Sequence, residues 1–338
     1  MKQSTGLVLG KFMPPHKGHC YLLDFASENC TDLRIVIDRI PNAPIPEAQR
    51  EEWLREMYPD AEVTTLQESL PQLPEETKDF WKIWSRTLRA LAPEGIDYLF
   101  AGESYGARLA DAVGATFIPA PGYRSEIPIS ATEIRADPIA NWHYIPEKVR
   151  PYFVKRVSIF GPESSGKSTL TEQLAAVFGT VFVPEFARIH LEAAGGRCVQ
   201  EDMEVIANGQ IALEELMVKR ANRVLFADTD PLVTPIWSEE LFGDCSEAIR
   251  EMVNSREYDL TLLLAPDLPW IRDTVRYLPN GGQRFFDRCV DALQKAGRRF
   301  EVIRGENRLS DAVNAIKREF PSISSREQIV SEEIQQSE

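Results

Sequence analysis

The chain has 338 residues, 43% of them hydrophobic and 27% charged, which is the balance of a soluble globular protein with room for two domains. Its longest apolar runs are far shorter than the ~20 residues that a membrane helix needs, so we expect no membrane insertion. The formal net charge of −14 argues against a protein that binds nucleic acid over its whole surface, so we expect no nucleic-acid partner.

Short apolar strands alternate with helices through the first half of the chain. We expect strands at residues 7–9, 33–37, 98–101 and 116–118. Residues 80–91 place large apolar side chains on one helix face. Strands that alternate with helices predict a parallel sheet covered on both faces, and right-handed crossovers make this a doubly wound α/β fold.

A second series of the same kind follows Pro151. We expect strands at residues 156–160, 181–183, 224–227, 260–264 and 300–303. Three prolines mark residues 138–151 as a short connector and not a flexible tether. The sequence therefore predicts domains over residues 1–150 and 151–320, followed by a polar, disordered tail over 321–338.

The cysteines number five and are widely scattered. An odd number without a CxxC pair predicts reduced thiols, and neither a disulfide framework nor a zinc site. Reduced thiols and the lack of an apolar leader predict a cytoplasmic protein.

A phosphate-binding candidate follows the first strand directly, in the stretch GKFMPPHKGH over residues 10–19. His16 and His19 fall in the first turn of the next helix, where free backbone N–H groups and the helix dipole favour an anion. Gly10 lets the main chain approach a ligand closely, and two prolines fix the turn that aims His16. The alternative is that both histidines only cap the helix.

A second cluster of the same domain is ISATEIR, residues 129–135. Ser130 and Thr132 precede an apolar helix start, and Arg135 follows three residues later. Hydroxyls, helix N-terminal amides and a guanidinium together suit a polyphosphate.

The stretch GPESSGKS over residues 161–168 fits the P-loop pattern G-x-x-x-x-G-K-[ST] without a mismatch, between an expected strand and a helix over 169–178. In such a loop the backbone N–H groups hold phosphates, Lys167 reaches the β- and γ-phosphate oxygens, and Ser168 contacts Mg²⁺. The expected ATP-binding residues here are Gly161, Glu163, Ser164, Ser165, Gly166, Lys167, Ser168 and Thr169.

Polar residues after the next strands are candidates for the phosphate acceptor. The end of the strand over 224–227 is expected near the P-loop, so either Asp228 or Asp230 would hold Mg²⁺ or orient an acceptor hydroxyl. Asp230 has the alternative of capping the following helix. Glu185 and Arg188 are acceptor-binding candidates or an ordinary surface pair.

The segment DLPWIRDTVR over residues 267–276 predicts a mobile lid. Either Arg272 or Arg276 would close on the transferring phosphoryl group. Trp270 would stack on a flat base, or else pack in the core.

The first two motifs resemble the HxGH nucleotidyltransferase superfamily, which closes with ISxTxxR. In combination with the P-loop, they make the chain resemble the bifunctional NadR family of NAD salvage over nearly its whole length. The other marks of this resemblance are Arg50 with Trp53, FWKIW over 80–84, YIPEKV over 144–149, ADTD over 227–230 and PWIRDTVR over 269–276.

The resemblance implies a Rossmann-like nicotinamide mononucleotide adenylyltransferase domain over 1–150 and a P-loop ribosylnicotinamide kinase domain over 151–320. It implies ATP binding in the first domain by Gly10, Lys11, Phe12, His16, His19, Ser130, Thr132 and Arg135. It implies mononucleotide binding by Arg50, Trp81 and Trp84, and riboside binding by Glu185, Arg188, Asp228, Asp230 and Trp270. The implied catalytic residues are His16, His19, Lys167, Asp228 and Arg276, and the implied metal ligands are Ser168 and Asp228.

The implied reactions use ATP and Mg²⁺ twice. Nicotinamide riboside would be phosphorylated to nicotinamide mononucleotide, and the mononucleotide would be adenylylated to NAD with release of pyrophosphate. A homo-oligomer is compatible with this reading. Enterobacterial members carry an N-terminal helix-turn-helix repressor domain, but the first strand here begins by Gly6, so we expect no repressor role.

Two other functions fit the same motifs. A pantetheine-phosphate adenylyltransferase fused to dephospho-CoA kinase also pairs an HxGH domain with a P-loop domain. A nucleotide-sensing regulator with little turnover would bind the same ligands, although complete catalytic motifs argue against it.

Overall fold

The computed structural model describes residues 4–102, 105–121, 127–254 and 256–323. The chain divides into two compact units, Met1–Arg150 and Pro151–Glu338, and each unit has its own five-stranded parallel sheet. Of the tail expected over 321–338, residues 324–338 lie outside the described part. Ile323, which the prediction placed in the disordered tail, is buried. Among the described helices, none has the length and apolar character needed to cross a bilayer. All five cysteines are unpaired, as expected.

The first unit is a doubly wound α/β fold, as predicted. Its strands are β1 (Thr5–Gly10), β2 (Asp32–Ile37), β3 (Glu62–Thr65), β4 (Tyr98–Ala101) and β5 (Thr116–Pro119), in the order β3-β2-β1-β4-β5. Its helices include α1 (Lys17–Glu28), α2 (Glu47–Met57), α3 (Phe80–Leu91), α4 (Tyr105–Val113) and α6 (Ala131–Ala136). The sequence analysis missed β3, because only Val63 of its four residues is buried.

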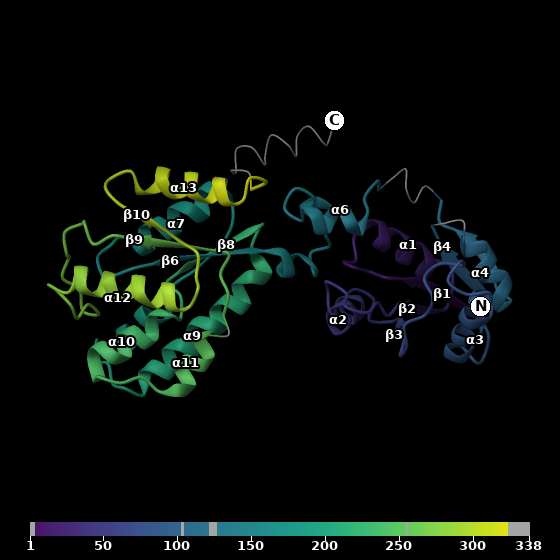
Figure 1. Cartoon of the computed structure of the whole chain (residues 1–338), viewed down its shortest axis with the longest axis horizontal. Helices are drawn as coiled ribbons and strands as arrows, with labels where there is room; N and C mark the ends of the chain where they lie inside the picture. The colour runs from purple at the N-terminus through teal and green to yellow at the C-terminus, as the bar shows by residue number, and fades with distance from the viewer. Residues whose placement is uncertain (1–3, 103–104, 122–126, 255, 324–338) are drawn as a thin grey trace. The chain divides into compact units, whose positions relative to one another are not determined.

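Alternation along β1 explains why both faces of this sheet are covered. Leu7 points into a core that contains Trp84 and Leu88 of α3, whereas Val8 points into a core with Leu23 of α1 and Leu54 of α2. A parallel strand buried on both faces reads as a continuous apolar run, and β1 does so. Figure 1 shows α1 and α3 beside the strands of this unit.

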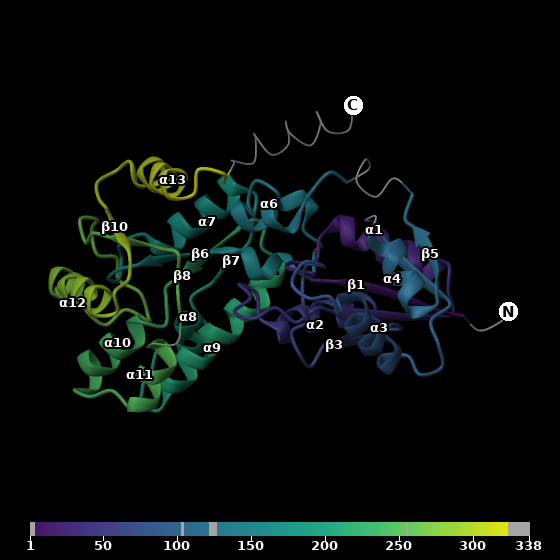
Figure 2. The same ribbon diagram turned by 45° about the vertical axis from the view of Figure 1, so that its right-hand side comes forward.

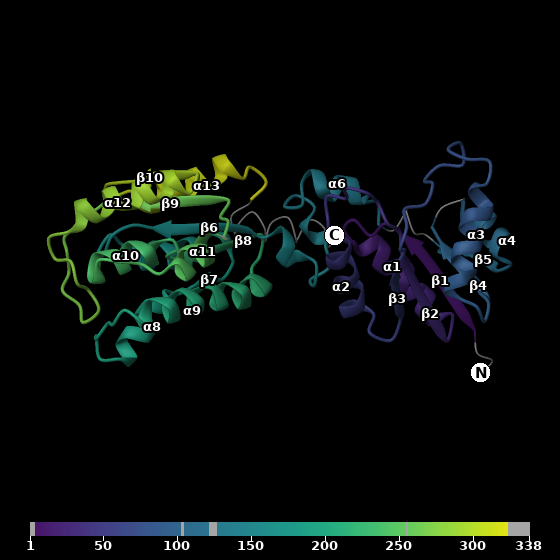
Figure 3. The same cartoon turned by 60° about the horizontal axis from the view of Figure 1, so that its bottom comes forward.

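The second unit repeats this architecture with other lengths. Its strands are β6 (Lys155–Phe160), β7 (Phe182–Val183), β8 (Val224–Asp228), β9 (Leu260–Leu264) and β10 (Phe300–Ile303), in the order β10-β9-β6-β8-β7, which Figure 3 shows across the sheet. Its helices include α7 (Lys167–Phe178), α8 (Phe186–Ala193), α9 (Asp202–Met217), α10 (Val233–Phe242), α11 (Glu247–Asn254), α12 (Gly282–Lys295) and α13 (Arg308–Glu319). Helices α7 and α13 cover one face, and α9 to α12 cover the other (Figures 1 and 2).

The strand orders define where ligands are expected. In each sheet the chain order reverses beside the central strand, which is β1 in the first unit and β6 in the second. Ligands of open α/β sheets bind at this switch point, outside the carboxyl ends of the strands. The stretch 10–19 follows β1 and the P-loop follows β6, so both phosphate motifs begin at the expected place.

Candidate active sites

A cavity of about 1140 Å³ lies at the carboxyl end of β1. Of the residues expected in the first site, it is lined by Gly10, Lys11, Phe12, His16, His19, Trp81, Trp84, Ser130, Thr132 and Arg135. Arg135 donates hydrogen bonds to the Met13 carbonyl and, over 3.1 Å, to the Thr132 hydroxyl. The structure therefore brings the two distant phosphate motifs to one cavity.

The two histidines of this cavity hold each other in place. His16 is the N-cap of α1: its Nδ1 accepts from the His19 backbone N–H at 3.3 Å, and His19 Nδ1 accepts from the His16 N–H at 3.3 Å. A side chain on Gly18 would come within 2.9 Å of the His16 ring, which explains the glycine between them. They do cap the helix, but they also line the cavity, so the two readings are compatible.

Burial keeps both imidazoles neutral. It lowers the pKa of His16 to about 4 and that of His19 well below its usual value, with the charge of His16 as a further cause for His19. Because Nδ1 of each ring accepts a hydrogen bond, the proton of the neutral ring is on Nε2. Each ring thus has an Nε2–H group available as a donor for an anion.

Phe12 and Gly10 support this pair. Phe12 is buried, and its ring centroid lies 5.0 Å from that of His19. A Cβ on Gly10 would come within 2.9 Å of the Phe12 ring. The packing of Phe12 therefore already requires glycine at position 10, apart from any close approach of a ligand.

Two residues expected to bind the mononucleotide are mainly supporting residues. Arg50 is fully buried behind the cavity wall, where its Nη1 donates to the carbonyls of Lys11 at 2.7 Å and Asp38 at 3.2 Å. Trp84 is buried and donates from Nε1 to the Pro71 carbonyl at 2.9 Å. The half-buried Trp81 offers a ring face, over which the Arg108 guanidinium lies at 5.0 Å.

Asp38 is a cavity residue that the sequence analysis missed. It follows β2 directly, is only 4% exposed, and its Oδ1 has no hydrogen-bond partner in the described part of the chain. Burial raises the pKa of its carboxyl group. Its position as the first polar residue after a parallel strand was the signal that would have identified it.

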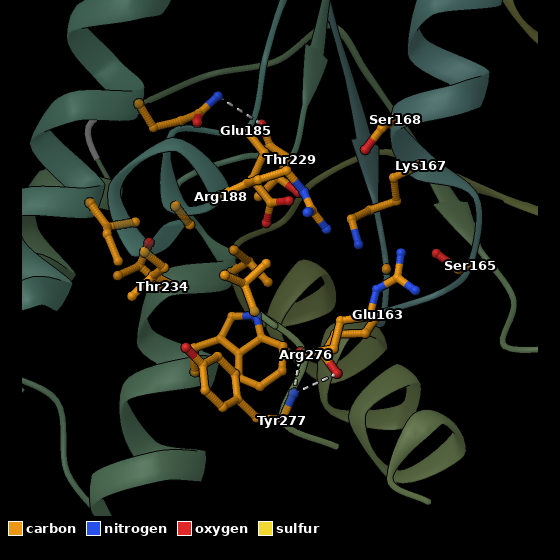
Figure 4. A pocket seen from close by; sticks show the side chains of 18 of the residues that line it. Glu163, Ser165, Lys167, Ser168, Glu185, Arg188, Thr229, Thr234, Arg276 and Tyr277 are labelled. Carbon is orange, nitrogen blue, oxygen red and sulfur yellow. Dashed lines mark hydrogen bonds between the residues drawn. The ribbon is translucent and has the colours of Figure 1, made fainter. Parts of the chain in front are cut away.

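A second cavity, of about 180 Å³, lies at the carboxyl ends of β6, β7 and β8. Of the expected residues, it is lined by Gly161, Glu163, Ser164, Ser165, Gly166, Lys167, Ser168, Thr169, Glu185, Arg188, Asp230 and Arg276. Figure 4 shows Lys167 and Ser168 on one side of it, and Glu185, Arg188 and Thr229 facing them. The structure thus gathers nearly all residues predicted for the second site.

The P-loop has the backbone that its glycines predict. Gly161 has a φ of 138°, and a Cβ there would lie 2.7 Å from the Leu264 carbonyl oxygen. Gly166 has a φ of 85° and caps the start of α7. Lys167 Nζ donates to the Pro162 carbonyl at 2.9 Å, inside the loop that would surround a phosphate. The helix N-terminus beneath this loop favours an anion.

Asp228 and Glu185 are two buried acidic groups that the charge of Lys167 influences. Burial raises the pKa of Asp228, while the charge of Lys167 and a hydrogen bond with Ser168 act against this rise. Burial also raises the pKa of Glu185, again opposed by Lys167. Asp228 lies just behind the residues that line the cavity, and its Oδ1 has no hydrogen-bond partner in the described residues.

Asp230 is engaged elsewhere. It is fully buried, Arg298 Nη1 donates to its Oδ2 at 2.6 Å, and the Leu232 N–H donates to its Oδ1 at 2.7 Å. The Leu232 contact lies in the turn before α10, whose N-cap residue is Leu232 and has no side-chain capping bond, so Asp230 does not cap this helix. Because both of its oxygens already accept hydrogen bonds, Asp230 is less available than Asp228 for an acceptor hydroxyl or a metal. Between the two aspartates, Asp228 is the one with a free oxygen.

The segment expected as a lid is bound to the P-loop. Glu163 accepts from the N–H groups of Tyr277 at 2.9 Å and Leu278 at 3.1 Å, and Ser164 Oγ accepts from the Ile271 N–H at 3.1 Å. The first of these contacts is drawn in Figure 4.

Of the residues proposed for this segment, Arg276 lines the cavity, whereas Arg272 is exposed and neither it nor Trp270 contributes to the lining. Arg188 reaches the segment through an ion pair with Asp273, at 3.0 Å. Arg188 thus joins α8 to this segment through Asp273 and also pairs with the exposed Glu192 at 2.9 Å, so it is not simply a surface partner of Glu185.

Each unit thus carries a phosphate-binding turn at the carboxyl end of its central strand, one of the HxGH type and one of the P-loop type. These features define a protein with two separate nucleotide sites. A family model described as "AAA domain" matches residues 156–308, which contain the second site.

Known proteins agree with this class. The chain is 29% identical over 330 residues to the trifunctional NAD biosynthesis/regulator protein NadR of Escherichia coli, covering 90% of this chain and 80% of the relative. It is 32% identical over 135 residues to a nicotinamide-nucleotide adenylyltransferase of Thermococcus kodakarensis, covering 38% of this chain and 70% of that protein. A crystal structure of a NadR protein in complex with NR matches it with a TM-score of 0.81, at 22% identity over 94% of this chain and 96% of the other. The chain belongs to the NadR family.

Proposed function

We propose that this protein makes NAD in two ATP-dependent steps. Residues 151–320 phosphorylate nicotinamide riboside to nicotinamide mononucleotide and release ADP. Residues 1–150 transfer the adenylyl group of a second ATP to the mononucleotide and release pyrophosphate. The observation that carries the proposal is the presence, in one member of the NadR family, of a histidine cavity and a P-loop cavity, each with its phosphate-binding groups assembled.

In the kinase step, the P-loop amides and Lys167 bind the phosphates of ATP. The oxygen of the riboside hydroxyl attacks the γ-phosphorus and its proton is released to solvent, while the bond to the oxygen that bridges the β- and γ-phosphates breaks and ADP leaves. Arg276, which lines the cavity beside the P-loop, stabilises the charge of the transferring group. Glu185 and Arg188, on the opposite side, bind the riboside hydroxyls.

Ser168 and Asp228 fit a magnesium site. Asp228 has an oxygen without a partner and lies beside the Ser168 hydroxyl. Mg²⁺ at nucleotide sites usually has one or two protein ligands and completes its shell with phosphate oxygens and water. Among the described residues, no three acidic, histidine or cysteine side chains form a metal cluster. A site with only two protein ligands, Ser168 and Asp228, is compatible with this. A magnesium ion here would neutralise phosphate charge.

In the adenylyl step, no side chain acts as a nucleophile. The phosphate of the mononucleotide attacks the α-phosphorus of ATP and pyrophosphate leaves, so the protein acts by orienting both groups and stabilising charge. The Nε2–H groups of His16 and His19 donate to the phosphate oxygens, and Ser130, Thr132 and Arg135 hold the triphosphate. Trp81, whose half-buried ring lines the cavity, contacts the pyridine ring, while Trp84 and Arg50 support the wall.

The partners in this proposal are small molecules: nicotinamide riboside, nicotinamide mononucleotide, ATP and NAD. Nucleic acid is not among them. We place the reactions in the cytoplasm, where ATP is available.

Product analysis tests this function. Purified protein with ATP and Mg²⁺ should release ADP when nicotinamide riboside is added, and pyrophosphate together with NAD when nicotinamide mononucleotide is added. The matched controls are phosphopantetheine and dephospho-CoA, which should give neither product. Turnover on these controls, or turnover far below one per minute on both pyridine substrates, would replace the proposal with one of its two alternatives, since typical enzymes turn over at roughly 1–10³ per second.

A further inference from the structure

One buried amide joins the two acidic positions of the kinase cavity. Gln210 of α9 is 3% exposed and lines the cavity. Its Oε1 accepts from the Phe186 N–H at 2.8 Å, and its Nε2 donates to the Thr229 carbonyl at 3.4 Å. Phe186 directly follows Glu185, and Thr229 directly follows Asp228. A single side chain therefore holds the backbone next to both carboxylates.

The Thr229 contact matters because this backbone is strained. Thr229 is buried and has a φ of 78°, in the left-handed region that a β-branched residue rarely adopts. Such a conformation persists only where the surrounding structure fixes it. Here the Thr229 N–H donates to the Ile159 carbonyl at 3.1 Å, and the next residue, Asp230, is bound by Arg298.

The consequence of this turn is a separation of the two aspartates. Asp228 is directed to Ser168 and Lys167, whereas Asp230 is directed to Arg298. Gln210 donates to the carbonyl of Thr229, the residue between the two aspartates. Gln210 thus contributes to the orientation of Asp228.

The Phe186 contact leaves the Glu185 side chain available. Glu185 is the N-cap residue of α8, but its carboxylate makes no capping hydrogen bond. Unpaired N–H groups at a helix start need an acceptor, and Gln210 Oε1 supplies one for Phe186. The Glu185 carboxylate is therefore not needed as a cap of α8, and it lines the cavity.

The close packing of α9 against Phe186 allows the Gln210 side chain to make both hydrogen bonds. A Cβ on Gly209 would come within 2.2 Å of the Phe186 ring. Glycine inside a helix is unfavourable compared with alanine, so a specific contact is expected to explain it. At this position, glycine lets α9 approach Phe186 closely enough for the neighbouring Gln210 to bridge the two backbones.

We propose that Gln210 is a positioning residue for riboside phosphorylation, which fixes Glu185 and Asp228 relative to the P-loop without contacting the reacting atoms. This inference rests on the proposed kinase activity. Misplacement of a catalytic group by about 1 Å can lower the rate ~10²-fold. We therefore expect loss of the Gln210 hydrogen bonds to lower kcat and to leave ATP binding unchanged.

The test is Gln210→Met, which keeps the length of the side chain but removes both hydrogen bonds. We expect kcat for ADP release with nicotinamide riboside to fall about 10²-fold, while KM for ATP changes less than about threefold. Pyrophosphate release with nicotinamide mononucleotide should not change and reports on folding. Ile211→Val, the next residue of α9 and not among those that line the cavity, is the matched control and should alter kcat by less than about threefold.

A second substitution tests whether loss of the Gln210–Thr229 hydrogen bond contributes to the decrease in kcat. Because glycine adopts a positive φ without strain, Thr229→Gly in the Gln210→Met background should restore about tenfold of the lost kcat. If Gln210→Met does not fold, Gln210→Glu replaces it: this side chain still accepts from Phe186 but cannot donate to Thr229 when ionised, and kcat should fall about tenfold.

The possible failures are distinguishable. Equal loss of kcat in Gln210→Met and Ile211→Val, parallel loss of both activities in a folded protein, or unchanged kcat in the Gln210 variants would each overturn the positioning role. Absence of riboside phosphorylation by the parent protein would instead overturn the proposed function.

Discussion

Burial decides the protonation state of the histidines at the first cavity. Water stabilises a charged imidazole far better than a protein interior does, so the pKa of His16 falls to about 4. The neutral rings then use Nδ1 to accept backbone N–H groups and retain an Nε2–H group, the donor that the proposed function assigns to a phosphate. Protonation would remove the Nδ1 acceptor and break the cap of α1. The neutral state of both rings therefore preserves the cap of α1 and leaves N–H groups that can donate to an anion.

This arrangement predicts a pH dependence of stability. The folded pKa of His16, about 4, lies below the unfolded value of 6.5, so the unfolded state binds the proton first as the pH falls. The contribution of His16 to the unfolding free energy should be complete above pH 6.5 and decrease by up to ~3 kcal/mol between pH 6.5 and 4. In His16→Asn, whose side-chain oxygen still accepts from the His19 N–H, this decrease should be absent. The measurement is chemical denaturation of both proteins across this range.

Other groups titrate in the same range with the opposite sign. Burial raises the pKa of Glu214 to about 7, so its contribution to stability decreases as the pH rises above the unfolded value of 4.5. The difference between wild type and His16→Asn cancels this effect, because Glu214 is present in both. Parallel pH profiles of wild type and His16→Asn would contradict the neutral-histidine account.

At the residue scale, sequence motifs predicted which side chains gather but not which atoms they use. Asp228 and Asp230 are equivalent in the sequence, and only the contacts of Asp230 with Arg298 and Leu232 separate them. Likewise Trp81 and Trp84 are one turn apart on α3, and burial decides that Trp84 packs. Hydrogen bonds between distant segments have no local signal in the chain.

At the scale of elements, the P-loop and the segment over 271–278 form one hydrogen-bonded assembly. A charged carboxylate that accepts backbone N–H groups makes stronger hydrogen bonds than a neutral acceptor. Glu163 accepts from Tyr277 and Leu278 in this way, so the P-loop that would bind phosphate also holds the segment that carries Arg276. Binding at the loop and the position of this segment are therefore expected to be coupled.

Glu163→Gln tests the coupling. The neutral amide has one accepting oxygen, so the segment should open more readily, and the amides of Tyr277 and Leu278 should exchange with deuterium about tenfold faster than in wild type. Hydrogen-exchange mass spectrometry of the peptide over 271–278 measures this. Glu192→Gln is the matched control, since it removes an exposed partner of Arg188 and should leave the exchange of these amides unchanged. Unchanged protection in Glu163→Gln would show that the segment is held by other contacts.

At the scale of the whole molecule, the alternation of strands and helices predicted both parallel sheets, because period and turn chemistry are local properties of the chain. The exception was β3, which is short and has one buried residue, so its pattern resembles a loop. Motif spacing did not reveal Gln210, and it gave no indication that Arg50, which the family resemblance named, is a buried support of the cavity wall. Their roles depend on contacts across tens of residues, which only the folded chain defines.

The central claim is that one chain carries two ATP sites that work separately. The most direct measurement is the release of ADP with nicotinamide riboside and of pyrophosphate with nicotinamide mononucleotide, in parallel, for wild type, Lys167→Ala and His19→Ala. Lys167→Ala should lower ADP release at least ~10²-fold and leave pyrophosphate release within about twofold of wild type, and His19→Ala should do the reverse. Loss of both products from either single substitution, in a protein that remains folded, would contradict two independent sites.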